Sequence, residues 1–185
     1  MDQPILTRPP AEAWAAEAVG QAQHLRDAAE VIRRLAAGLT YHPVTGRRPQ
    51  ASPELLDALA AVERVVRMIQ QGAEARGLDQ IVASDAFGAE QVRCSHAAVE
   101  GGVQAVVSAL GVLRQVLEAR EDATLDAPYG RGAPARHHPG ALCTIVAERV
   151  EDLARALEVA AVTWANLALR TDQGDPPSPR KWIPG

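Results

Sequence analysis

Hydrophobic and polar residues follow a helical period over four long segments of this chain. In residues 11–39, apolar side chains recur three or four positions apart, which places them on one face of a helix. That face consists of Trp14, Ala18, Leu25, Ala28, Ile32, Leu35 and Leu39, and Gln21 interrupts it. A second helix is predicted from Pro53 to about Arg76, with the seam Leu55, Leu59, Val62, Val66, Ile69 and Ala73. Ser52, Pro53 and Glu54 form a typical helix start, because they supply a cap, a fixed φ angle and an anion near the positive end of the helix.

The third and fourth segments continue the same period. Residues from about 85 to 120 predict a helix with the seam Val92, His96, Val99, Val103, Val106, Leu110, Leu113 and Leu117. Gly101 and Gly102 lie in its middle, where each costs roughly 1 kcal/mol relative to alanine. They therefore predict either a kink or the close approach of another backbone. The last helix is predicted over 140–170, with the seam Cys143, Val146, Val150, Leu153, Leu157, Ala160, Trp164 and Leu167.

These segments predict an all-α protein, an antiparallel four-helix bundle with long helices. We find no alternating pattern typical of strands. The bundle would form a single domain over residues 11–170, preceded by a flexible leader at 1–10. Residues 171–185 contain four prolines and little to bury, which predicts a disordered tail.

Composition and charge narrow the setting of the protein. The formal net charge is -4, which argues against a surface dedicated to nucleic acid or anionic lipid. The first ten residues lack the apolar stretch of a signal peptide. The uncharged run 101–113 is shorter than the roughly 20 residues of a membrane span. Cys94 and Cys143 do not make a disulfide framework. We therefore expect a cytoplasmic protein that does not enter a membrane.

An alternating up-and-down topology would bring the first and third connections to the same end of the bundle. Neither 40–52 nor 127–144 contains an acidic residue. The helices that follow these connections would point their free amides toward that end, which favours anions, and the carboxyl ends of the preceding helices would partly cancel that field. The sequence therefore predicts a cationic end that could bind a phosphate ligand, a nucleic acid or a protein partner. Its candidate residues are Tyr41, His42, Arg47, Arg48, Tyr129, Arg131, Arg136, His137 and His138. The alternative is that these loops are solvated segments of an Arg-rich chain.

Arg131 and His137 are separated by five residues. This spacing resembles the arginine–histidine motif of HEPN-type helical ribonucleases, which are also helical bundles. The resemblance covers seven residues, and it implies RNase activity with Arg131, His137 and His138 as the most reactive groups.

Metal and cofactor chemistry has little support in the sequence. No glutamate is followed by histidine three positions later, as a di-iron bundle requires. Cys94 and His96 would point to different sides of a helix, and Cys143 would lie at the opposite end of the bundle. We expect His96 to be a core histidine and Cys143 a small buried hydrophobe. No cofactor and no metal are predicted.

The leading hypothesis is a non-enzymatic interaction or scaffold module that self-associates. Several apolar residues lie off the seams and could either complete the core or meet a partner: Val31, Val65, Met68, Val107 and Val112. Trp182 in the tail could dock on a protein partner or pack against the bundle. The alternatives are a binder of nucleic acid or phosphate ligands at the basic loops and the HEPN-like ribonuclease.

Overall fold

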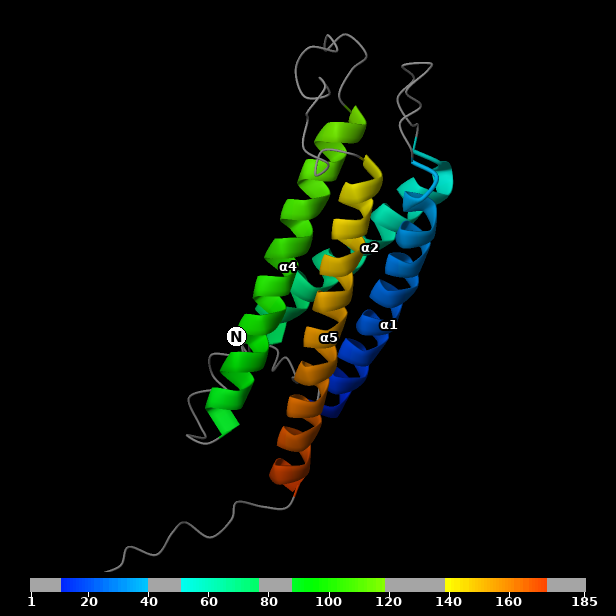
Figure 1. Ribbon diagram of the computed structural model, residues 1–185. Coiled ribbons are helices and arrows are strands. Elements are labelled where there is room, and N and C mark those ends of the chain that lie inside the picture. The colour runs from blue at the N-terminus through cyan, green and yellow to red at the C-terminus, as the bar shows by residue number, and fades with distance from the viewer. Residues whose placement is uncertain (1–10, 40–50, 77–87, 119–138, 173–185) are drawn as a thin grey trace, which may run out of the picture.

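The computed structural model describes residues 11–39, 51–76, 88–118 and 139–172. These residues form α1 (Ala11–Ala36), α2 (Pro53–Arg76), α4 (Gly88–Glu118) and α5 (Pro139–Asp172). The four helices run alternately up and down the long axis of the molecule (Figure 1). The predicted all-α antiparallel bundle is therefore confirmed for the described part of the chain.

The helix ends follow the local chemistry of the sequence. The backbone N–H of Leu55 donates to Ser52 Oγ at 3.2 Å, and the backbone N–H of Leu56 donates to the Ser52 carbonyl at 3.1 Å. Ser52 is thus the predicted cap of α2, because its hydroxyl satisfies an amide that has no partner within the helix. At the other end of the preceding connection, α1 ends at Ala36 rather than at Leu39. The N–H of Gly38 bonds to the Leu35 carbonyl at 3.0 Å and closes a turn there.

The helices pack unequally around one core. Helix α5 lies between α1 and α4, and its interface with α1 is the most extensive. Helix α2 crosses behind these three helices (Figure 1), where it packs mainly on α1 and barely touches α4. Among the described residues, α4 therefore has one extensive partner, α5, and its far side is open.

The seams predict most of the core. The largest fully buried side chains include Leu25, Ile32, Leu55, Leu113, Leu153 and Leu157. Trp14 and Trp164 are also buried, as predicted, and their rings meet edge to face with centroids 6.4 Å apart. The side chains of Ala73 and Leu167 lie outside the described residues.

The position of His96 on the seam of α4 is a correction. The structure buries Ser95 instead, with its hydroxyl donating to the Val92 carbonyl at 3.0 Å. His96 lies at the edge of the core with 26% of its side chain exposed, and its Nδ1 is 3.6 Å from Glu100 Oε1. Because α4 meets α5 on the Gly102 side, the buried arc of the helix is rotated toward Ser95 and away from His96.

Gly101 and Gly102 predict either a kink or the close approach of another backbone. The structure gives a different result for each of the two glycines. A Cβ on Gly102 would lie 3.0 Å from Leu153 Cδ1 and 3.3 Å from Leu153 Cα. Another backbone therefore does come very close at Gly102. A Cβ on Gly101 would meet no atom within 4 Å.

Candidate functional site

The sequence predicts that one end of the bundle is cationic. In the structure, this is the end where α1 and α4 finish and α2 and α5 begin (Figure 1). The topology thus brings the boundaries of both basic connections to one end. The nine candidate residues, Tyr41, His42, Arg47, Arg48, Tyr129, Arg131, Arg136, His137 and His138, all lie outside the described residues. The anion site and the resemblance to HEPN-type ribonucleases therefore stay predictions. Trp182 also lies outside the described residues.

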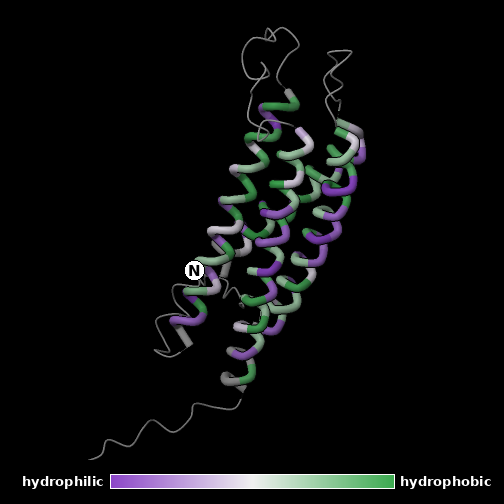
Figure 2. The backbone as a smooth tube through the Cα atoms, in the orientation of Figure 1, coloured by the Kyte–Doolittle hydropathy of each residue, from purple (hydrophilic) through white to green (hydrophobic). Residues whose placement is uncertain are grey.

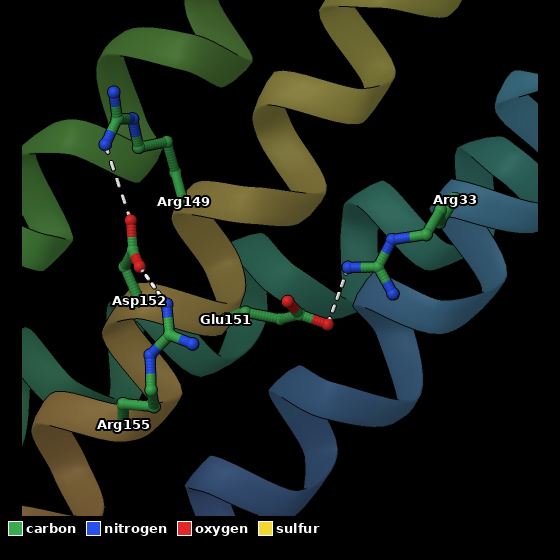
Figure 3. Close-up of polar contacts among 5 residues, drawn as sticks. All are labelled: Arg33, Arg149, Glu151, Asp152 and Arg155. Atoms are coloured by element: carbon green, nitrogen blue, oxygen red, sulfur yellow. Dashed lines mark hydrogen bonds and ion pairs between the residues drawn. The ribbon is translucent and has the colours of Figure 1, made fainter.

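The described basic residues of α1 near this end are already paired with acids. Arg33 reaches Glu151 of α5, with Nη2 and Oε1 at 2.6 Å (Figure 3). Arg34 forms an ion pair with Glu54 in the first turn of α2. These pairs hold α1 against its two neighbours. They are more than one-third exposed, so each contributes little to stability.

The two cysteines differ in environment and are both free thiols. Cys143 is fully buried in α5, and burial raises the pKa of its thiol from 9.0 to about 11. Since the thiolate is the reactive form, this cysteine is a core residue rather than a nucleophile at neutral pH. Cys94 is exposed near the start of α4. The helices that carry the two residues start at opposite ends of the bundle, so their side chains are not brought together (Figure 1).

The described residues contain no group of three or more His, Cys, Asp or Glu side chains that could hold a metal ion. The buried polar groups are few in this part of the chain. Gln21 is 4% exposed, and its Nε2 donates to Glu17 Oε1 at 2.9 Å. The side-chain oxygen of Gln21, Oε1, has no hydrogen-bond donor among the described residues.

The exposed apolar residues are the most distinctive feature of the described surface. Of the residues predicted to lie off the seams, Val65 is buried and Val31 packs partly on the core. Met68, Val107 and Val112 remain exposed, with 44–46% of their surface accessible. A second set of exposed apolar residues was not predicted from the sequence, and it comprises Val19, Leu56, Ile145, Val159, Val162 and Leu169. The sequence does indicate part of this set, because apolar residues recur at 159, 162 and 169, on the side of α5 opposite its seam.

Helix α4 differs from its neighbours because its outward side carries few charged residues. Between Cys94 and Leu113, Glu100 is the single residue with a fixed charge. Helix α1, by contrast, exposes Glu12, Glu17, Arg26, Asp27, Glu30, Arg33 and Arg34. Figure 2 shows the same contrast, with α4 hydrophobic along most of its length.

Length and composition would allow one of the described helices, α4, to cross a membrane, and 28% of its apolar window is buried in the bundle. A core helix of a soluble protein also passes this test, so it is weak evidence for a membrane span.

Comparisons with known proteins give no relative for this chain: no family model, no curated protein and no solved structure matches it.

Proposed function

We propose that this chain is a non-enzymatic helical-bundle interaction module that self-associates in the cytoplasm. The supporting observation is the outward side of α4 between Cys94 and Leu113, where Glu100 is the one fixed charge, together with the exposed apolar residues of α5. Val159 and Val162 are 60% and 62% exposed, and Val112 of α4 is 45% exposed. Single exposed apolar residues are common on protein surfaces, whereas an outward helix side that is nearly free of charge is typical of an interaction site.

The physical reason is a difference in hydration. A helix on the outside of a soluble bundle usually carries charged residues on its solvent side. The outward side of α4 carries one such residue, Glu100, between Cys94 and Leu113, so contact with another apolar surface would remove the rest of this side from water at a gain of roughly 25 cal/mol per Å². Self-association provides such a surface without requiring a second protein.

Sedimentation velocity on the purified chain, from sub-micromolar to millimolar concentrations, tests this proposal. We expect the average mass to rise from that of the 19.6 kDa chain toward twice that value. A mass that stays at one chain over the whole range would contradict self-association.

A second candidate function is anion binding at the end of the bundle where α2 and α5 begin. The observation that favours it is the common location of these two helix starts, which direct the positive ends of two helix dipoles to the end where the basic connections attach. Binding of short RNA or DNA, followed by fluorescence anisotropy, would then weaken steeply as salt is raised. Affinity that is absent at low salt, or unaffected when Arg47, Arg48, Arg131 and Arg136 are changed to alanine, would exclude this candidate.

A further inference from the structure

Ion pairs mark the outward edge of the interface between α1 and α5. Arg33 reaches Glu151, and Arg26 reaches Glu158, in each case with 2.6 Å between a guanidinium nitrogen and a carboxylate oxygen. The two arginines are seven residues apart on α1, and the two glutamates are seven residues apart on α5. A spacing of seven keeps residues on nearly the same side of a helix, so further residues at this spacing extend the same edge.

Toward the start of α1 and the end of α5, the same edge becomes apolar. Val19 lies seven residues before Arg26. Val162 and Leu169 lie four and eleven residues after Glu158. At 100° per residue, each of the three is within about 40° of the ion-paired residue of its helix. Val19, Val162 and Leu169 are 55%, 62% and 58% exposed. Exposed aliphatic side chains therefore replace the ion pairs in this part of the edge.

The two buried tryptophans fix the level of this apolar part. The rings of Trp14 and Trp164 meet with centroids 6.4 Å apart. Ala15 follows Trp14, and Val162 lies two residues before Trp164, so Ala15 and Val162 are near the same level of the two helices. Ala15 is half-buried and packs against the core, which leaves a shallow apolar floor beside the valines. We call the following residues the α1–α5 patch: Ala15, Val19, Val162 and Leu169.

Charged residues bound the patch at both ends. The ion pair of Arg26 and Glu158 lies on the side toward the middle of the bundle. On the opposite side, Glu12 is exposed in the first turn of α1, three residues before Ala15. A partner that fits this surface therefore carries a large apolar group with a positive charge next to it.

The chain that follows α5 is long enough to return over the patch. Helix α5 ends at Asp172, and residues 173–185 lie outside the described residues. From Asp172 back to Val162 is about 15 Å along the helix, at 1.5 Å per residue. The ten residues from Asp172 to Trp182 span about 31 Å as an extended polyproline II chain. Trp182 can thus reach Val162 with about half of this length left for reversing the direction of the chain.

The sequence of residues 173–185 has the chemistry that the patch requires. Trp182 and Ile183 are its two large apolar residues, and an indole typically buries about 150–250 Å². Arg180 and Lys181 come directly before them. When the chain runs back along α5, residues before Trp182 lie nearer the end of the helix. The two cations therefore fall on the side of the patch where Glu12 lies.

Tethering favours the patch of the same chain over that of a second copy. A segment joined by a short linker has an effective concentration in the millimolar range. A second copy reaches such a concentration only in very concentrated solutions. At micromolar protein concentration, the patch is therefore occupied from within its own chain.

We propose that residues 173–185 fold back along α5 and pack Trp182 and Ile183 on the α1–α5 patch of the same chain, with Arg180 and Lys181 beside Glu12. This contact does not depend on the proposed self-association. It covers Val162 and leaves the outward side of α4 accessible, so it limits the surface on which a second copy can pack.

Fluorine NMR of the full chain labelled with 5-fluorotryptophan tests this contact. The chain has three tryptophans, and Trp182→Phe identifies the resonance of Trp182. We expect this resonance to differ from that of the labelled synthetic peptide 173–185. Val162→Lys should move it toward the peptide position and lower the docking constant at least about tenfold, because the new cation lies against the indole and beside Arg180 and Lys181. Val107→Lys, at an exposed valine of α4, should leave it unchanged.

A second matched pair tests the charges. Glu12→Lys and Glu90→Lys make the same change at exposed sites, each in the first turn of its helix, so the cost of opposing the helix dipole is shared. We expect the first variant alone to weaken docking. Circular dichroism and thermal unfolding show whether the variants are folded. If Val162→Lys does not fold, Val19→Lys takes its place.

The occupant of the patch is tested by crosslinking. In the Cys94→Ala background, Val162→Cys combined with Ile183→Cys should form a disulfide within one chain when oxidised glutathione is added. Val107→Cys combined with Ile183→Cys should not. The buried Cys143 stays in all these variants.

Four results would overturn the proposal. The first is a Trp182 resonance at the peptide position in the wild-type chain. The second is a shifted resonance that Val162→Lys and Val19→Lys leave in place. The third is a shift that grows from about 10 µM to about 1 mM protein, since a tethered contact does not depend on concentration. The fourth is a shift that appears only with phosphatidylcholine and phosphatidylglycerol vesicles. A chain that is monomeric in sedimentation and has a docked Trp182 refutes the proposed self-association alone.

Discussion

The contact between Gly102 and Leu153 provides a sharp test of how closely α4 and α5 pack. Alanine at position 102 would gain roughly 1 kcal/mol from its higher helix propensity. Its Cβ, however, would lie 3.0 Å from Leu153 Cδ1 and 3.3 Å from Leu153 Cα. Leu153 is fully buried, so its side chain cannot rotate into solvent, and the Cα belongs to the backbone of α5. Inserting a methyl group into such a site costs typically about 1–3 kcal/mol.

Gly111→Ala is the matched control for this change. It makes the same substitution in the same helix, but a Cβ there meets no atom within 4 Å. The gain in helix propensity is common to both variants and cancels when they are compared. The free energy of unfolding of Gly102→Ala should therefore be lower than that of Gly111→Ala by about 1–3 kcal/mol. Relative to wild type, Gly111→Ala should be stabilised and Gly102→Ala destabilised.

Urea unfolding followed by circular dichroism measures this difference directly. For a chain of this size, a change of 1 kcal/mol in the free energy of unfolding corresponds to about 2–4 °C in Tm. In thermal unfolding, the Tm values of the two variants should therefore differ by roughly 2–12 °C. The measurements should be made at low protein concentration, so that self-association does not contribute. Equal stability of the two variants would refute the reasoning, because it would mean that α4 and α5 are not in contact at this point.

Three further predictions concern the cap, the core and the buried thiol. Ser52→Ala should lower the free energy of unfolding by about 1 kcal/mol in urea titrations, because the Leu55 amide loses its acceptor, and no loss would mean that another group caps α2. Leu25→Ala should cost about 2–5 kcal/mol, whereas Met68→Ala, at an exposed site, should cost less than about 0.5 kcal/mol. Similar costs at the two sites would contradict the assigned burial. The raised pKa of Cys143 predicts a loss of stability in alkali. The stabilisation that the Cys143 thiol contributes is full below pH 9.0, the pKa of this thiol in the unfolded chain. It is lost as pH rises to about 11, by up to about 3 kcal/mol, because only the unfolded thiol ionises in that window. Unfolding of Cys94→Ala, compared with Cys94→Ala/Cys143→Ala across that range, measures this loss, and parallel pH curves would contradict it.

Sequence alone was sufficient for the helices and most of the core. Helical periodicity and capping depend on residues within four positions of each other, so Ser52 marks the start of α2 before any tertiary contact is known. The seams of α1 and α5 likewise identify Trp14 and Trp164 as core residues, because one face of each long helix must be buried. The predicted candidates for an anion site lie outside the described residues, so the sequence remains their only support.

The tertiary structure decided what depends on neighbours distant in the chain. Ser95 and not His96 is buried because α5 approaches α4 from the Gly102 side. Val65 is covered and Val112 is exposed because α2 packs on α1 and barely touches α4. The level at which Gly102 of α4 meets Leu153 of α5 could not be read from the sequence either. That level follows from the register between two helices, which is set by side-chain packing across their interface and not by either helix alone.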